Sequence, residues 1–289
     1  RAVAGAAGAE AARIVGTTRT AEKFPVLRAA GIEPFVFDGA AVSDAVRDAL
    51  RTATHLIVSI APGEAGDPVL RAFPDLRSAM PALEWIGYLS TVGVYGDHGG
   101  AWVDEATPCR PVSKRSVERV AAEQAWQDAA GRAGAPLAVL RLSGIYGPGR
   151  NAFVNLENGT AKRLVKAGQV FNRIHVADIA GALLLLSKRR LGGIYNVTDD
   201  LPAPPQDVVA HAAGLMGMAA PPEEDFETAA LSPMARSFYG ENKRVSNAAI
   251  KKAGYSFQFP DYRAALSALW RDGDWRASES SPARSMMRD

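Results

Sequence analysis

The stretch LEWIGYLST, residues 83–91, decides the fold because it joins an apolar run to a short polar end. A strand this apolar is typical of a parallel sheet with helices on both faces. HLIVSIAPG at 55–63 and PLAVLRLSGIYG at 136–147 have the same character. A segment with helical spacing precedes each of these strands, at 41–53, 67–80 and 113–133. Strands that alternate with helices predict an α/β fold with a doubly wound parallel sheet.

Shorter segments extend this pattern toward both ends. We expect strands at 12–18 and 32–39, and a helix at 20–31 that Thr20 caps and Gly31 ends. The regular alternation of strands and helices ends near residue 150. It is followed by a strand at 192–200, a helix at 204–217 and a polar insert at 221–255. We therefore expect a core domain at 1–150, a smaller lobe with returning core elements at 151–276, and a polar, disordered tail at 277–289.

The first twelve residues, RAVAGAAGAEAA, do not have room for a strand, a turn and a crossover helix. A parallel crossover needs a dozen or more residues, so we interpret this segment as the first crossover helix itself. The first strand and any glycine-rich phosphate loop are then expected upstream of residue 1. Gly5 and Gly8 are not assigned to such a loop.

Composition argues against several classes of protein. The 289 residues are 47% hydrophobic, with 33 basic and 31 acidic side chains, so no basic excess predicts nucleic-acid binding. The single cysteine, Cys109, allows no internal disulfide, and the four histidines lack metal-ligand spacing. No apolar run reaches 18 residues and no signal peptide pattern opens the chain. We expect a soluble cytoplasmic protein that binds neither metal nor membrane.

Five stretches in order resemble one enzyme family. They are LSTVGVYGD (89–97), RLSGIYGPGR (141–150), IHVADIA (174–180), YNVTDD (195–200) and ENKRVSNAAIKKAGY (241–255). The chain resembles an extended or atypical short-chain dehydrogenase/reductase of the NAD(P)-dependent epimerase/dehydratase type, over about residues 1–275. The last stretch is most similar to an uncharacterised bacterial subgroup. The resemblance implies a Rossmann-type sheet, a small C-terminal substrate lobe and a dinucleotide cofactor.

The strand that ends near residue 18 has Thr17, Thr18 and Arg19 where an NAD enzyme places an acid on the adenosine ribose. An arginine there accommodates the 2′-phosphate of NADP, so we predict NADP in preference to NAD; a solvated turn is the alternative. By resemblance, Asp38 and Gly39 meet the adenine, although Asp38 serves equally well as a turn cap. Small residues let the dinucleotide lie close to the next strand end, at Ser59, Ile60, Ala61 and Pro62.

The reactive loop follows the strand at 83–91. Leu89 and Ser90 are assigned to the cofactor, and Thr91 matches the family's catalytic hydroxyl, with a loop cap as the alternative. Tyr95 faces substrate or packs in the loop.

The family's acid/base pair, Tyr-x-x-x-Lys, is replaced in this chain. With AEQ at 122–124 as the anchor, the tyrosine position is Arg115 and the lysine position is Arg119. Arginine keeps its proton at any working pH, so neither residue can transfer one. Arg115 is instead expected to bind an anion or polarise a carbonyl, and Arg119 to contact the cofactor. A solvated helix face is the alternative for both.

The loop after the strand at 136–142 is expected to pack on the nicotinamide through Leu142, Ser143, Gly144 and Ile145. Tyr146 is an alternative catalytic hydroxyl. The substrate wall is predicted at Arg150, Asn172 and Arg173, whereas His175 and Asp178 are expected to be structural, with Asp178 as a helix cap.

Two hypotheses for the function remain open. The first is an NAD(P)-dependent oxidoreductase or epimerase that acts on a nucleotide sugar or another small polar substrate through non-standard groups. The second is an NADP(H)-binding sensor or scaffold with little catalysis, which the loss of the tyrosine and lysine favours. A homodimer through the helices at 67–80 and 113–133 is possible by resemblance.

Overall fold

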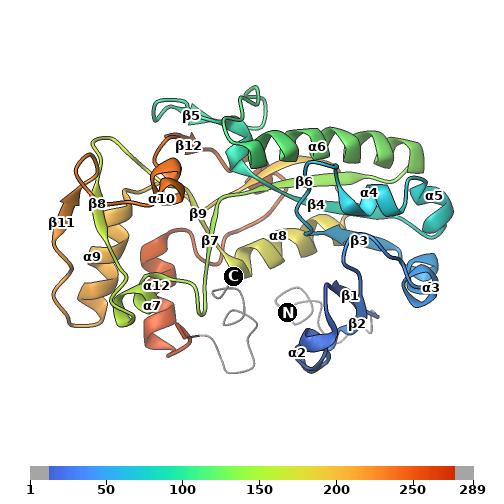
Figure 1. The fold of residues 1–289 in the computed structure, drawn as a ribbon, viewed down its shortest axis with the longest axis horizontal. Coiled ribbons are helices and arrows are strands. Elements are labelled where there is room, and N and C mark those ends of the chain that lie inside the picture. The colour runs from blue at the N-terminus through green and yellow to red at the C-terminus, as the bar shows by residue number, and fades with distance from the viewer. Residues whose placement is uncertain (1–12, 277–289) are drawn as a thin grey trace. The chain divides into compact units, whose positions relative to one another are not determined.

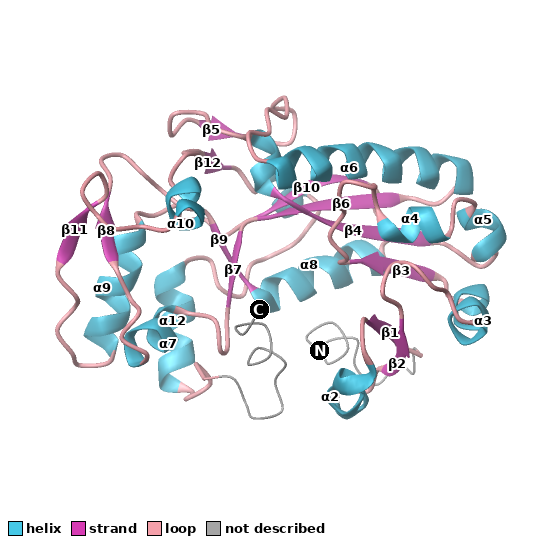
Figure 2. Ribbon diagram, in the orientation of Figure 1, coloured by secondary structure: helices cyan, strands magenta, loops and turns pink. Residues whose placement is uncertain are grey.

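Apolar runs become the strands of a central sheet in the computed structural model, which describes residues 13–276 (Figure 1). The sheet has the order β10-β6-β4-β3, with strands at Gly193–Val197, Leu137–Leu142, Trp85–Thr91 and His55–Val58. The four strands lie side by side in the order in which they occur along the chain, and β3 pairs with β4 in parallel, so a crossover connects these two. The predicted α/β fold with a parallel sheet is confirmed (Figure 2).

A second parallel pair precedes this sheet in the chain. It consists of β1 at Val15–Thr18 and β2 at Glu33–Val36, with Thr18 opposite Val36. Within residues 13–276, no strand joins this pair to β3. The helix expected at 1–12 and the tail at 277–289 lie outside the described residues.

The longest helix, α6 at Lys114–Ala133, matches its predicted range closely. It begins where the Ser113 hydroxyl accepts from the Ser116 amide, and it ends at Gly134, whose φ of +72° favours glycine. Trp126 anchors the helix, because its side chain is fully buried beside Ile86 of β4 and Tyr88 in one hydrophobic cluster.

The helix predicted at 67–80 is in fact two short helices, α4 at Pro68–Ala72 and α5 at Leu76–Ala79. The prediction was wrong because Phe73 precedes a proline, which disfavours the helical conformation at that residue. Each helix has its own aspartate cap: Asp67 accepts from Val69 and Leu70, and Asp75 accepts from Ser78.

Other helices near the sheet depart from expectation only at their ends. The segment predicted at 20–31 is a 3-10 turn followed by a helix, and Thr20 makes no side-chain capping bond, so that cap was wrong. Ser43 caps α3. The bounds are η1 Ala21–Lys23, α2 Phe24–Ala29, α3 Asp44–Thr52 and α8 Val176–Lys188.

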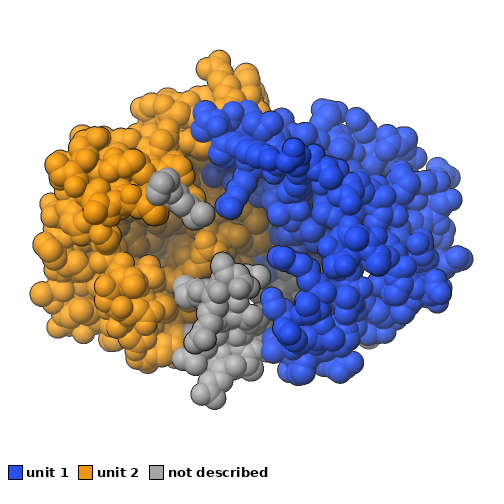
Figure 3. Space-filling model, in the orientation of Figure 1, with its two compact units in different colours: residues 1–94, 111–141, 180–195 blue, residues 95–110, 142–179, 196–289 orange. Residues whose placement is uncertain are grey.

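The chain divides into two compact units, each built from several segments (Figure 3). Unit 1 comprises residues 1–94, 111–141 and 180–195, and unit 2 comprises 95–110, 142–179 and 196–289. The predicted division at residue 150 stays a prediction.

Unit 2 contains three small parallel strand pairs, β5–β12, β7–β9 and β8–β11. The segment predicted as one strand at 136–147 is two strands, and the second of them, β7, pairs with β9. The strands are β5 Trp102–Val103, β7 Gly144–Tyr146, β8 Arg163–Val165, β9 Arg173–His175, β11 Glu223–Asp225 and β12 Arg244–Val245. The helical elements are η2 Val92–Tyr95, at the boundary between the units, α7 Ala152–Glu157, α9 Pro205–Leu215, α10 Pro233–Phe238, α11 Ala248–Lys252 and α12 Tyr262–Arg271.

A hydrophobic cluster joins α7, α9 and α12. Phe153, Ala212 and Leu266 are buried in it, together with Trp275. Helix α12, which the sequence analysis did not anticipate, begins at Asp261, whose side chain accepts from the Ala264 amide.

Two features of the described residues concern binding to membranes and to metal ions. No helix of the described residues is both long and apolar enough to cross a membrane. Residues 13–276 also contain no group of three or more His, Cys, Asp or Glu side chains that could hold a metal ion.

Candidate functional site

In unit 1, the end of β4 brings together three residues. The Thr91 hydroxyl accepts from the Gly93 amide at 3.1 Å, so it caps the turn that follows the strand. A side chain at Gly93 would meet the Ser116 hydroxyl at 2.9 Å and that of Thr91 at 3.4 Å. Both hydroxyls therefore lie beside Gly93. Ser116 was missed in the sequence analysis because nothing in α6 alone indicates that its first turn reaches this strand end.

The two arginines of α6 differ sharply in their surroundings. Arg119 is half-buried, and its Nη1 donates to the Tyr88 hydroxyl at 3.0 Å and to the Leu89 carbonyl at 2.9 Å. Its guanidinium also lies 5.6 Å from the centre of the Tyr88 ring. Arg115 is exposed, and no hydrogen bond or ion pair of its side chain occurs within the described residues. Arg119 is thus anchored to β4, whereas Arg115 has its full donor capacity available.

Tyr88 was not expected at this site. Burial raises the pKa of its phenol to about 12, against the opposing effect of the Arg119 cation. The phenol therefore stays protonated near neutral pH. Tyr88 is therefore not suited to transfer protons at that pH.

Ser90 points to the other side of β4, as alternation along a strand requires. Its hydroxyl donates to the Glu123 carboxylate, which also forms an ion pair of 2.7 Å with Arg141. All three side chains are buried, with Glu123 at 3% and Arg141 at 4% exposure. The structure gives Ser90 a core partner, although a cofactor contact was expected.

The strand ends expected to contact the adenosine carry polar side chains, several of which are exposed to solvent. Thr17 and Arg19 are exposed at the end of β1, Thr18 is half-buried, and Arg19 has no side-chain partner within residues 13–276. Asp38 serves as a turn cap: its Oδ1 accepts from Ala40 and Ala41, and these bonds lower the pKa of its carboxyl.

The loop after β3 is also accessible. Ser59 and Ala61 are exposed, whereas Ile60 packs against the unit 1 core and Pro62 is half-buried. The loop continues into a tight turn in which Gly63 and Gly66 exchange two backbone hydrogen bonds.

In unit 2, Tyr95 is fully buried, and its hydroxyl donates to the Asn196 side chain at 2.7 Å. The packed alternative is therefore the one that the structure favours for this residue. Asn172 is likewise engaged: it donates to the Lys243 carbonyl and accepts from the Val245 amide, so it holds β12 in place. Its amide group makes structural bonds at both ends, where a substrate contact was expected.

Asp178 was predicted to cap a helix, but its carboxylate accepts hydrogen bonds from a distant loop. It is fully buried and accepts from the Tyr255 hydroxyl and from the amides of Gln258 and Phe259. This carboxylate fixes a loop 80 residues further along the chain, and its role could not be deduced from local sequence.

The loop expected to meet the nicotinamide is held by backbone bonds. Ser143 donates its amide to the Val197 carbonyl, and Gly144 donates to Asn172. Leu142 is buried, whereas Ile145 is 37% exposed.

The Tyr146 hydroxyl is buried without a hydrogen-bond partner among the described residues, and burial strongly raises its pKa. The ring packs edge-on against His175 at 5.4 Å. Burial lowers the pKa of His175 to about 4, so this imidazole is neutral near pH 7. Neither group is set up to exchange a proton with a ligand near neutral pH.

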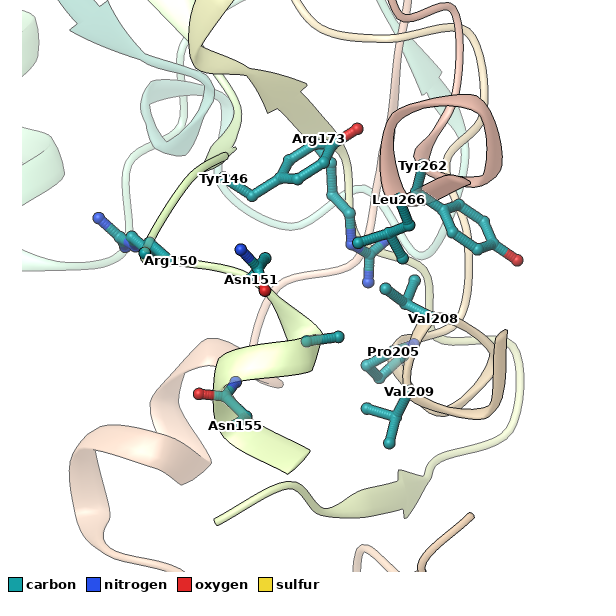
Figure 4. A pocket seen from close by; sticks show the side chains of 12 residues that line it. Tyr146, Arg150, Asn151, Asn155, Arg173, Pro205, Val208, Val209, Tyr262 and Leu266 are labelled. Atoms are coloured by element: carbon teal, nitrogen blue, oxygen red, sulfur yellow. The ribbon is translucent and has the colours of Figure 1, made fainter. Parts of the chain in front are cut away.

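A pocket of about 270 Å³ lies entirely within unit 2 (Figure 4). Its charged lining residues are Arg150 and Arg173. Figure 4 shows the Arg173 guanidinium directed between Val208 and Leu266, while Arg150 points away from them. The other lining residues come from the end of β7, from the loop before α7 and from α7, α9 and α12: Tyr146, Gly149, Asn151, Ala152, Asn155, Pro205, Val209 and Tyr262.

Both arginines of this pocket were predicted from the sequence, whereas its apolar wall was not. The wall comes from α9 and from α12, and no local pattern indicates that these helices face Arg173. The one available signal was the apolar spacing of Tyr262, Leu266 and Leu269 behind a capping aspartate.

Comparison with known proteins agrees with this architecture. Residues 77–198 match the model of the NAD dependent epimerase/dehydratase family. A functionally unknown conserved protein from Silicibacter pomeroyi is 48% identical, with 94% of each chain covered and a TM-score of 0.85. A protein from Methylobacillus flagellatus, provisionally named an NAD-dependent epimerase/dehydratase, is 26% identical, with 94% of each chain covered and a TM-score of 0.69.

A more distant structure shares the fold alone. The human epimerase family protein SDR39U1, solved with NADPH, is 17% identical over 90% of this chain and 100% of that one, with a TM-score of 0.66. The family match covers the end of β4, the α6 arginines and the loop before the pocket. Residues 77–198 of the chain are thus similar to the NAD dependent epimerase/dehydratase family.

Proposed function

We propose that this protein is an NADP(H)-dependent oxidoreductase or epimerase that acts on a small polar substrate carrying a negative charge. The observation that carries the proposal is the contrast within α6. Arg119 is tied to β4, whereas Arg115 is exposed at the position that matches the family's tyrosine. A free guanidinium there can bind an anion or polarise a carbonyl, although it cannot donate a proton.

Residues of unit 1 fit the adenosine half of the cofactor. Arg19 follows β1 directly, is exposed and has no side-chain partner in the described part of the chain. A guanidinium can bind the 2′-phosphate of NADP through two charge-assisted hydrogen bonds. Solved structures with the same fold hold either dinucleotide, NADPH in the human protein and NAD in others, so the preference for NADP rests on Arg19. Arg119 uses one terminal nitrogen on β4, which leaves its other nitrogens for a ribose hydroxyl.

The bound dinucleotide would supply hydride chemistry, and the protein would supply binding and orientation. Thr91 is the best placed hydroxyl for a substrate oxygen, because it accepts from Gly93 and keeps its own proton to donate. Tyr146 is a weaker candidate, since its hydroxyl is buried and its pKa is raised.

A second function has specific support. The chain has no tyrosine between residues 95 and 146. By resemblance, Arg115 and Arg119 are assigned to the positions of the acid/base pair. A protein that binds NADP(H) and senses its redox state needs no proton transfer. The same cofactor contacts therefore fit a sensor.

One experiment separates the two functions. The full-length protein is titrated calorimetrically with NADPH and NADH, and NADPH absorbance is then followed with neutral, carboxylated and phosphorylated carbonyl substrates. Turnover that favours the anionic substrates supports the enzyme, and tight NADPH binding without turnover supports the sensor. Absence of dinucleotide binding would overturn both.

A further inference from the structure

We propose that the unit 2 pocket binds a small monocarboxylate with a branched aliphatic body, and that Arg173 binds its carboxylate group. The inference rests on the proposed function only where it calls this ligand a substrate, because the binding site itself lies within one unit.

The Arg173 guanidinium is held in place but not neutralised. Its Nη1 donates to the carbonyls of Phe171 and Ala203, both at 3.0 Å. These two bonds orient the planar group, and its remaining nitrogens have no partner within residues 13–276. No carboxylate in the described part of the chain forms an ion pair with it. A fixed guanidinium edge with free donors matches the two oxygens of a carboxylate.

Asp199 forms no ion pair with Arg173, although its charge acts on that cation. Asp199 is 1% exposed, and burial raises the pKa of its carboxyl to about 8, against the opposing effects of the hydrogen bond from the Leu201 amide and of the Arg173 charge. The acid is therefore mostly protonated at neutral pH. Its Oδ2 also makes no hydrogen bond among the described residues. Among the described residues no carboxylate forms an ion pair with the Arg173 guanidinium, so an anionic ligand would supply a partner for its free donors.

The apolar side chains around Arg173 determine the chemistry of the uncharged part of the ligand. Val208, Val209 and Pro205 come from the start of α9, and Leu266 faces them from α12 (Figure 4). Such a surface favours a short branched hydrocarbon, because burial of apolar area stabilises a complex by about 25 cal/mol per Å². The volume of about 270 Å³ lies below the roughly 300–1,000 Å³ typical of larger ligands, so a whole nucleotide sugar does not fit.

The charge of the ligand is also constrained. A phosphate ester carries close to two charges at neutral pH, and moving both into an apolar pocket is costly unless each is paired. Arg173 is the one charged lining residue directed between the apolar side chains, since Arg150 points away. One guanidinium balances one carboxylate, so a monoanion is the better match.

Two variants test the pocket without endangering the fold. In Arg173→Gln, the carbonyls of Phe171 and Ala203 keep their mutual backbone hydrogen bonds, so neither is left without a donor. Asn155 is an exposed lining residue, and Asn155→Asp adds a negative charge without a change in shape. The control is Arg163→Gln, which removes an arginine that binds Glu223 outside the pocket.

The measurement is calorimetric binding of 4-methylpentanoate, its amide and isopentyl phosphate to the dinucleotide-free protein. We expect the carboxylate to bind most tightly and Arg173→Gln to weaken it about ten- to a hundredfold, the scale of a hydrogen bond to a charged group. Asn155→Asp should also weaken it, while Arg163→Gln should bind it as wild type does. Equal affinity for acid and amide, tighter binding of the phosphate, or no effect of Arg173→Gln would each overturn the proposal. Failure of NADPH binding in the separate assay would leave this result intact.

Discussion

The contrast between Arg115 and Arg119 leads to a prediction that uses one substitution at two positions of the same helix. Arg119→Ala removes both hydrogen bonds of Nη1, one to the Tyr88 hydroxyl and one to the Leu89 carbonyl. It also removes the guanidinium that lies over the Tyr88 ring. Arg115→Ala removes an exposed side chain without such contacts. Alanine is the best helix former, so propensity does not favour either arginine over the substitution.

The magnitudes follow from these contacts. Hydrogen bonds to a charged group contribute about 1.5–3 kcal/mol each, and because Arg119 is only half-buried we expect a total loss of about 2–4 kcal/mol. In a chain of this size 1 kcal/mol shifts Tm by about 2–4 °C, so Arg119→Ala should lower Tm by about 4–16 °C. Arg115→Ala should stay within about 0.5 kcal/mol of wild type.

The assay is differential scanning calorimetry of the cofactor-free protein, supported by urea unfolding at constant pH. Arg119→Ala should unfold earlier, and Arg115→Ala should coincide with wild type. If both variants lose the same stability, or if Arg119→Ala loses none, then Arg119 is not the anchored member of the pair. The assignment of Arg115 to ligand binding would lose its structural basis.

Three further predictions concern other parts of the molecule. Arg19→Ala should weaken the binding of NADPH by about 1.5–3 kcal/mol and leave the binding of NADH unchanged. Calorimetry that shows equal losses of affinity for both dinucleotides would contradict the 2′-phosphate contact. Folded His175 resists protonation down to about pH 4, whereas the unfolded imidazole takes up a proton below about 6.5. The free energy of unfolding should therefore fall by up to about 3 kcal/mol as the pH drops from 6.5 to 4. In urea titrations at several pH values, His175→Asn should lack this pH dependence, whereas the matched control His55→Asn should keep it. Glu123→Gln should cost about 3–5 kcal/mol because it leaves Arg141 buried without its carboxylate; an unfolding midpoint equal to that of wild type would refute this.

The sequence predicts elements whose ends are marked locally. Helix α6 is found almost to the residue, because Ser113 caps it and Gly134 ends it. The strand β4 is found from its apolar run. By contrast, the break between α4 and α5 was missed although Pro74 marks it, since apolar spacing on both sides suggested one continuous helix.

The candidate site is less predictable because its contacts are distant in sequence. Ser90 was assigned to the cofactor, yet its partner Glu123 lies 33 residues away. Asn172 was assigned to substrate, and its partners lie more than 70 residues further on. A motif can place such a residue at the end of a strand, but only the fold determines which side of the strand it faces.

The pocket illustrates the same limit. Arg173 and Arg150 are visible in the sequence as cations near a strand and a loop. The apolar wall that turns Arg173 into a selective site comes from α9 and α12, about 35 and 90 residues away. Hydrophobic periodicity shows that each helix has a buried face, but it does not show what that face meets.

The central claim is that Arg115 replaces proton transfer with anion recognition, and the substrate dependence of NADPH oxidation tests it most directly. Loss of a general acid slows a reaction by roughly 10²–10⁴-fold, so the full-length protein should reduce neutral carbonyl compounds weakly or not at all. Carbonyl compounds with a carboxylate or phosphate should react best, and Arg115→Gln should abolish that preference without a change in Tm. Rapid reduction of neutral carbonyl compounds, at a rate that Arg115→Gln leaves unchanged, would contradict the claim and point to another group as the acid.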